Sequence, residues 1–187
     1  MVASALFCAL APPGCSPSGE VSEPWPTAGA PLDNELVTPA PLVAPERWRV
    51  AGEAEDPMRA LRAGATLCSD GAAHVEGGGV EVSTASCNHA SLVQPSLRAV
   101  AAGDVVSVRA WWGVLDADAP ARGELAVFLA GELVWQDSVA IPGRPDARDV
   151  SFVSARDYPA GVPIVFHVHN HGSNNWTMGE ISVRRPD

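Results

Sequence analysis

The chain has 187 residues, of which 47% are hydrophobic and 18% charged. This composition is typical of a globular protein with a core and excludes a wholly disordered chain. The 22 acidic residues outnumber 12 arginines, no lysine is present, and the formal net charge is -10. Because an anionic surface repels the phosphate backbone, nucleic acid is not expected as a partner. The 17 prolines and 17 glycines favour many turns between short elements.

The N-terminus has the features of an export signal. Residues 2–11 form an uncharged apolar run, which is too short to span a bilayer of ~30 Å but is the length of a signal-peptide core. Gly14-Cys15 then resembles the lipobox of bacterial lipoproteins, which implies a lipid anchor on Cys15. Pro12 and Pro13 depart from that pattern, and no basic residue precedes the run, so an ordinary cleavage site with Cys15 as a plain cysteine stays open. We therefore predict a signal in residues 1–15 and an extracytoplasmic protein, either an outer-membrane or periplasmic lipoprotein or a secreted one.

The four cysteines support export. Cys8 is removed with the signal, and Cys68 and Cys87 both lie in the expected folded region. Pairing these two in a disulfide and lipidating Cys15 accounts for every remaining thiol. The alternative is a Cys/His site at Cys87 and His89.

A flexible stalk is predicted over residues 16–45, because this stretch is rich in Pro, Ala and Ser and has no basic residue or apolar period. The folded domain is predicted over 46–187. A strand is expected at 47–50, and then one short helix over 56–64, with Asp56 as N-cap, Pro57 in the first turn and Gly64 as its stop.

Short alternating runs then predict a series of β-strands separated by turns. They lie at residues 73–76, 80–83, 91–94, 104–115, 124–130, 133–140, 149–154, 163–169 and 176–183. This rhythm predicts an all-β fold, a two-sheet jelly-roll-like β-sandwich with one short helix after a disordered N-terminal stalk.

Three of the five histidines lie in one row on the strand at 163–169 and just after it. His167, His169 and His171 share the face opposite Phe166 and Val168, since side chains alternate along a strand. Two of them with a residue from elsewhere, such as His89, His74 or Glu180, could hold Zn or another divalent metal. The alternatives are a polar sheet face without metal and hydrogen bonding to an organic ligand.

Six tryptophans against one tyrosine form the second unusual feature. Trp111 is expected with Arg109 on the face opposite Val106, Val108 and Trp112, where an indole beside polar side chains suits a sugar ring. Trp48, Trp112 and Trp135 are expected in the core.

The stretch from Gly172 to Trp176 that leads into the last strand resembles the final loop and strand of galactose-binding-like jelly-roll domains and carbohydrate-binding modules. The chain is also similar to uncharacterised myxobacterial lipoproteins. The resemblance implies a carbohydrate or envelope polymer as ligand, and the positions carried over are Arg109, Trp111, Asn174, Asn175 and Trp176. The alternatives are a metal-binding protein built on the histidine row and a purely structural envelope protein. No nucleophile-elbow or zinc-protease motif supports an enzyme.

Overall fold

The computed structural model describes residues 38–186. The predicted signal, Cys15 and most of the predicted stalk lie outside the described residues. The described chain contains eleven strands in two antiparallel sheets. The all-β sandwich expected from the sequence is confirmed.

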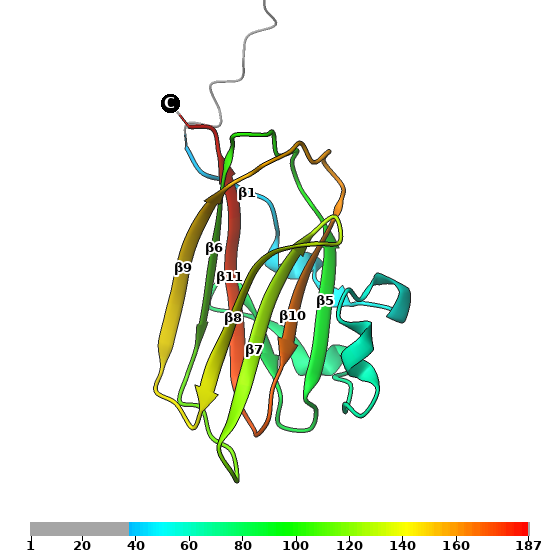
Figure 1. The fold of residues 1–187 in the computed structure, drawn as a ribbon, viewed down its shortest axis with the longest axis vertical. Helices are drawn as coiled ribbons and strands as arrows, with labels where there is room; N and C mark the ends of the chain where they lie inside the picture. Colours follow the sequence, from blue (N-terminus) through cyan, green and yellow to red (C-terminus); the bar gives the residue numbers. More distant parts are fainter. Residues whose placement is uncertain (1–37, 187) are drawn as a thin grey trace, which may run out of the picture. The chain divides into compact units, whose positions relative to one another are not determined.

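The six-stranded sheet has the order β3-β4-β11-β6-β9, with β1 also paired to β11. Its strands are β1 (Ala40–Pro41), β3 (Ala73–Glu76), β4 (Gly79–Ser83), β6 (Val105–Trp112), β9 (Asp146–Val153) and β11 (Asn175–Arg184). The five-stranded sheet has the order β2-β5-β10-β7-β8. Its strands are β2 (Arg49–Val50), β5 (His89–Pro95), β7 (Ala121–Leu129), β8 (Glu132–Ile141) and β10 (Pro163–His169). Figure 1 shows β5, β10, β7 and β8 side by side, with β9, β6 and β11 forming the second layer.

The core lies between the two sheets and follows the predicted alternation. On β6, Val106, Val108 and Ala110 are buried, whereas Arg109 is exposed on the outer face. The strand was predicted to extend from 104 to 115, but β6 ends at Trp112 and Val114 beyond it is 72% exposed. The alternation of buried and exposed side chains therefore continues only as far as the strand is hydrogen-bonded to its neighbours in the sheet.

The predicted helix over 56–64 is wrong in type and in its start. Only 3-10 helices occur in residues 38–186: η2 (Pro45–Arg47), η3 (Glu53–Glu55), η4 (Arg59–Arg62) and η5 (Asp70–Ala72). Met58 is the N-cap of η4, and the Met58 amide, at 2.9 Å, is the one backbone N–H that donates to the Asp56 carboxylate. The Asp56 carboxylate also accepts hydrogen bonds from Arg62 of η4 and from His89 and Ser91 of β5, described below. Gly64 does adopt the expected left-handed conformation, with φ of 95°.

The domain begins before residue 46. Ala40 and Pro41 pair with Val183 and Ser182 of β11, and Leu42 is fully buried in the core. The predicted boundary at residue 46 lies too late in the chain. A Pro-rich composition gives no signal for a strand of two residues followed by one buried leucine.

The predicted disulfide between Cys68 and Cys87 is confirmed. Residues 51–66, which include η3 and η4, are here called the covering segment. The disulfide lies just after this segment and joins its C-terminal end to Cys87. Ala51 and Met58 of this segment pack on Val93, Phe128 and Val165 of the five-stranded sheet as a small second core. The outer face of β10 is therefore buried as well as its inner face. In Figure 1 the 3-10 helices lie beside β5.

Candidate functional site

A broad open cleft of about 1270 Å³ lies at the end of the sandwich where β11 begins. Its walls are the loops at residues 84–88, 116–120 and 171–173 together with the ends of β7, β8 and β10. Small side chains such as Ala85, Ala117 and Ala119 form much of its lining. The polar side chains that reach it include Asn88, Asp118, Arg122, Glu124, His169 and His171.

Buried amides hold these loops in place. The Asn174 Oδ1 atom accepts the Asp116 amide at 2.7 Å, and Asn174 Nδ2 donates to the Asp116 carbonyl at 3.1 Å. Asn170 Nδ2 donates to Thr84 Oγ1 at 2.6 Å and to the Gly172 carbonyl at 2.8 Å. A side chain at position 172 would collide with the Asp116 carbonyl, because its Cβ would lie 2.0 Å from that oxygen. The cleft is therefore bounded by loops that are tied to one another.

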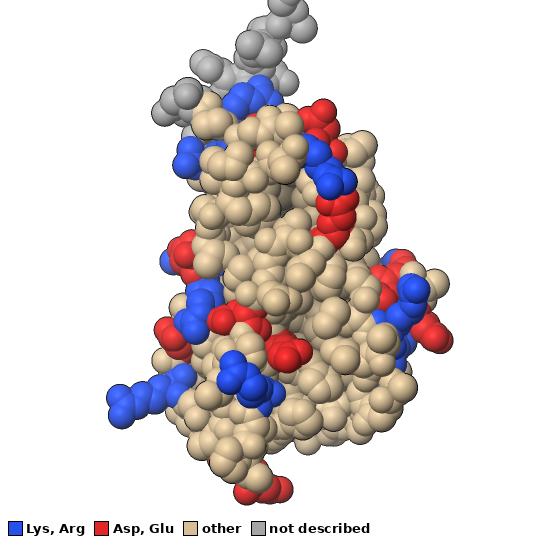
Figure 2. Space-filling view, in the orientation of Figure 1, with Lys and Arg blue, Asp and Glu red and all other residues tan. Residues whose placement is uncertain are grey.

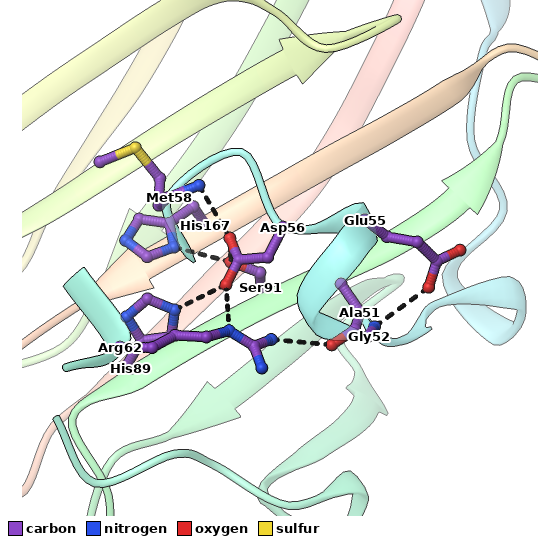
Figure 3. A network of polar contacts seen from close by, with 9 residues as sticks. All are labelled: Ala51, Gly52, Glu55, Asp56, Met58, Arg62, His89, Ser91 and His167. Carbon is purple, nitrogen blue, oxygen red and sulfur yellow. Dashed lines mark hydrogen bonds and ion pairs between the residues drawn. The ribbon is translucent and has the colours of Figure 1, made fainter. Parts of the chain in front are cut away.

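Beneath the covering segment, a buried polar network is centred on Asp56, which is 1% exposed (Figure 3). The Asp56 Oδ2 atom lies 2.7 Å from Arg62 Nε and 2.9 Å from His89 Nε2. Its Oδ1 atom accepts Ser91 Oγ at 2.7 Å, and Ser91 Oγ also lies 2.8 Å from His167 Nδ1. Asp56 therefore links the covering segment to β5 directly and to His167 of β10 only through Ser91.

Opposing effects act on the pKa of Asp56. Burial alone would raise it, but the hydrogen bonds from Arg62, His89, Ser91 and the Met58 amide outweigh that effect and lower the pKa to about 2. The carboxylate is thus ionised at neutral pH and can only accept hydrogen bonds.

This charge fixes the positions of the ring protons. His89 must carry a proton on Nε2 to donate to Asp56. Ser91 has a single proton, which goes to Asp56, so the contact with His167 requires a proton on His167 Nδ1. Figure 3 shows both rings with these nitrogens toward Asp56 and Ser91 and with their other nitrogens on the side away from Asp56.

His167 is fully buried, and its pKa is lowered to about 3, chiefly by burial and next by the neighbouring His89. It is therefore a neutral imidazole across the physiological range. The pKa of the half-buried His169 is also lowered, first by burial and then by His171 and His89.

The structure brings all four predicted histidines together. His89 lies directly across from His169 in the pairing of β5 with β10. The His89 ring centroid lies 4.7 Å from that of His167 and 6.1 Å from that of His169, and the His169 and His171 centroids are 5.3 Å apart. His169 and His171 line the cleft, whereas His167 and His89 lie under the covering segment.

The five residues predicted to bind sugar are not brought together. Trp176 is 0% exposed and packs on Trp112 with ring centroids 5.5 Å apart, while Asn174 is a buried anchor of the cleft loops. Neither side chain is available to a ligand. Arg109 and Trp111 do share the outer face of the six-stranded sheet, and Asn175 is exposed at the start of β11.

Trp111 has a structural contact of its own. A Cβ at Gly179 would lie 1.9 Å from its ring, so the indole lies on the backbone of the bulge in β11. Arg109 Nε lies 3.5 Å from an Asp149 carboxylate oxygen. Of the tryptophans expected in the core, Trp112 is buried, and Trp48 and Trp135 pack against the core while partly exposed.

Sequence reasoning missed Asp56, Arg62 and Ser91 as members of a site. Asp56 was read as a helix cap, which is the commoner role of an Asp before Pro. Its contacts with His89 and Ser91 span 33 and 35 residues, so no local pattern could have indicated them.

Charge is dispersed over the face of the molecule shown in Figure 2. Acidic and basic side chains there form small mixed groups on a largely uncharged surface. No helix within residues 38–186 is long and apolar enough to cross a membrane.

No protein-family model matches the sequence, and no curated protein is significantly similar to it. Among solved structures, a CBM4 carbohydrate-binding module aligns with a TM-score of 0.41 and 9% identity, covering 65% of this chain and 79% of the module. TmCBM61, solved in complex with β-1,4-galactotriose, aligns with a TM-score of 0.37 and 13% identity over 62% of this chain and 75% of its own. The CBM51 module of a Clostridium perfringens GH95 protein, in complex with methyl-galactose, aligns with a TM-score of 0.35 and 13% identity over 63% of this chain and 78% of its own. An arabinose-bound α-L-arabinofuranosidase aligns over only 19% of its length, with a TM-score of 0.39 and 15% identity over 57% of this chain.

Proposed function

We propose that this protein is an exported saccharide-binding module and that its ligand lies in the cleft at the loop end of the sandwich. The observation that carries the proposal is the cleft itself, because it combines a lining of small side chains with converging polar groups of several kinds. A sugar presents apolar C–H faces and hydroxyls that both donate and accept hydrogen bonds.

The charges of the cleft favour a neutral ligand. Asp116, Asp118 and Glu124 are exposed there, and Arg122 is the one basic side chain among the lining residues. Part of Arg122 is already used, since its Nε donates to Ser138 Oγ at 2.7 Å. This negative balance disfavours phosphate and other anions. The openness and polarity of the cleft also suit a hydrated polyol better than a compact apolar ligand.

The disulfide supports export, because such bonds form and persist in oxidising compartments. We further propose that Cys15 carries a lipid that attaches the protein to the cell envelope. In a bacterial host supplied with labelled palmitate, the protein should incorporate label and Cys15→Ser should not. Equal incorporation by the two forms contradicts the anchor but leaves the saccharide proposal untouched.

The test of binding is a glycan array followed by calorimetry with the best ligand. Asp118→Ala and His171→Ala, both on the cleft, should each weaken binding by about tenfold, the effect of losing one hydrogen bond of about 1.4 kcal/mol. Trp111→Ala is the matched control, because Trp111 does not line the cleft.

Two results contradict the proposal. If Trp111→Ala abolishes binding while the cleft variants bind normally, the ligand lies on the outer face of the six-stranded sheet. An array without any ligand removes the saccharide function altogether and favours a purely structural envelope protein.

A further inference from the structure

Two groups of side chains in residues 38–186 bring three metal-ligating atoms within 4.8 Å of one another. One of them, Asp56 with His89 and His167, belongs to the network under the covering segment. Arg62 Nε lies 2.7 Å from the Asp56 carboxylate there, and its positive charge would repel a cation. The predicted histidine row forms no such group among the described residues. The other group lies on a different part of the molecule.

This second group is on the hairpin of β3 and β4, at the outer face of the six-stranded sheet. His74 and Glu81 lie directly opposite each other in the pairing of the two strands, and Glu76 follows His74 by two residues, so all three side chains share one face. His74 Nε2 lies 3.0 Å from Glu76 Oε2 and 3.6 Å from Glu81 Oε1. Two tetrahedral ligands of Zn²⁺, each about 2.0–2.2 Å from the ion, lie about 3.4 Å apart. The two separations therefore fit ligands of a single ion.

The charge of this group also favours a cation. No arginine of the described chain forms an ion pair with Glu76 or Glu81, and His74 is the one basic side chain that contacts them. One imidazole cannot neutralise two carboxylates, even when it carries both ring protons. The Glu81 side chain is only 17% exposed, so its charge is less well hydrated than one on an open surface. A divalent cation would neutralise both carboxylates at once.

The hairpin holds these side chains in place before any ion binds. Gly77 and Gly78 form its tight turn, with φ of 58° and 82°. The Trp111 indole lies against this turn, because a Cβ at Gly77 would lie 3.9 Å from its ring, and the same ring covers Gly179 of β11. Strand β4 is also paired with β11 on its other side. Ligands carried by a supported element of this kind lose little freedom when they bind a metal.

We propose that His74, Glu76 and Glu81 bind one Zn²⁺ ion. The His74 Nε2 atom and one oxygen of each glutamate supply three ligands, and water supplies the fourth, because the His74 and Glu76 side chains are 49% and 64% exposed. The imidazole favours Zn²⁺ over Ca²⁺ and Mg²⁺, which prefer oxygen ligands alone. The site requires no particular tautomer of His74, since the exposed ring releases a proton from Nε2 to water as the ion binds.

The test uses the whole chain, stripped with chelator and then titrated with Zn²⁺ alone in a calorimeter. We expect one equivalent to bind, and His74→Ala and Glu81→Gln each to weaken binding by about tenfold or more. Glu180→Gln is the matched control, because Glu180 is exposed on the same outer face, opposite Arg109, and lies outside the group. This variant removes the same charge and should bind Zn²⁺ as the wild type does.

A second measurement does not depend on any variant. In nitrogen-15 spectra of the wild type, Zn²⁺ should shift the signal of His74 Nε2 and leave the ring signals of His171 in place. The proposal is overturned if Zn²⁺ does not bind, if Glu180→Gln weakens binding as much as Glu81→Gln does, or if the His74 signal stays in place. None of the three ligand residues lines the cleft, so a glycan array without any ligand would leave this proposal standing.

Discussion

Acid should destabilise this domain through His167 in a pH window set by that residue's environment. Its pKa is about 3 in the folded protein and 6.5 in the unfolded chain. The folded pKa is the lower of the two, so the unfolded chain binds the proton first as the pH falls. The free energy of unfolding should therefore decrease below about pH 6.5 and keep decreasing until His167 is protonated near pH 3.

The magnitude follows from the distance between the pH and the unfolded pKa. At about pH 4.5 the unfolded ring lies about two pH units below its own pKa, and each unit is worth about 1.4 kcal/mol, so the loss from about pH 7 is about 3 kcal/mol. The lowered pKa of His169 acts in the same direction. Asp56 contributes little in this window, because its stabilising effect is lost only as the pH falls from about 4 toward its folded pKa of about 2.

The assay is urea unfolding of the metal-free protein at about pH 7 and at about pH 4.5, monitored by tryptophan fluorescence. His167→Asn keeps an N–H donor for Ser91 but cannot titrate, so it should lose about 3 kcal/mol less than the wild type on acidification. His171→Asn replaces an exposed histidine and should keep the full dependence. If His167→Asn loses as much stability as the wild type, the reasoning is refuted.

Other perturbations test the remaining parts of the fold. Replacing both disulfide cysteines with serine should lower the unfolding free energy by about 3 kcal/mol, as expected for a crosslink across 19 residues, and an unchanged denaturation midpoint would contradict this. Leu42→Ala should cost about 2–5 kcal/mol because the side chain is fully buried, whereas a residue of a flexible linker would show no measurable cost. Gly179→Ala should displace the Trp111 indole, with a shift in fluorescence and a loss of about 1–3 kcal/mol. Gly113→Ala, which meets no atom within 4 Å, is its control and should leave the spectrum unchanged.

The sequence predicted those parts of the fold that depend on local period. The strand at 163–169 was predicted with the bounds of β10, and the face shared by His167 and His169 followed from the same alternation. The disulfide followed from counting cysteines. These features need no knowledge of what packs against them.

Long-range packing decided the features that were wrong or missed. Trp176 is buried because Gly123 of the opposite sheet leaves room for it, since a Cβ at position 123 would lie 2.5 Å from the indole. The helix over 56–64 failed because Asp56 binds His89 and Ser91 instead of capping a helix. His167 was expected on a polar face of the sheet, and the covering segment is what buries it. Each outcome depends on a residue distant in the sequence.

The pairing of β1 with β11 determines where the domain can be attached to a tag or a surface without covering the cleft. Ala40 lies beside Val183, so the described chain enters and leaves at one end of β11, whereas Asn175 begins that strand at the cleft. Ten residues of extended strand separate these ends by roughly 30 Å. An affinity tag, a fluorescent fusion or a bead attached to the domain directly before Ala40 or directly after Arg184 would therefore lie away from the mouth of the cleft, and ligand capture on a sensor chip should not depend on which of these two ends is immobilised.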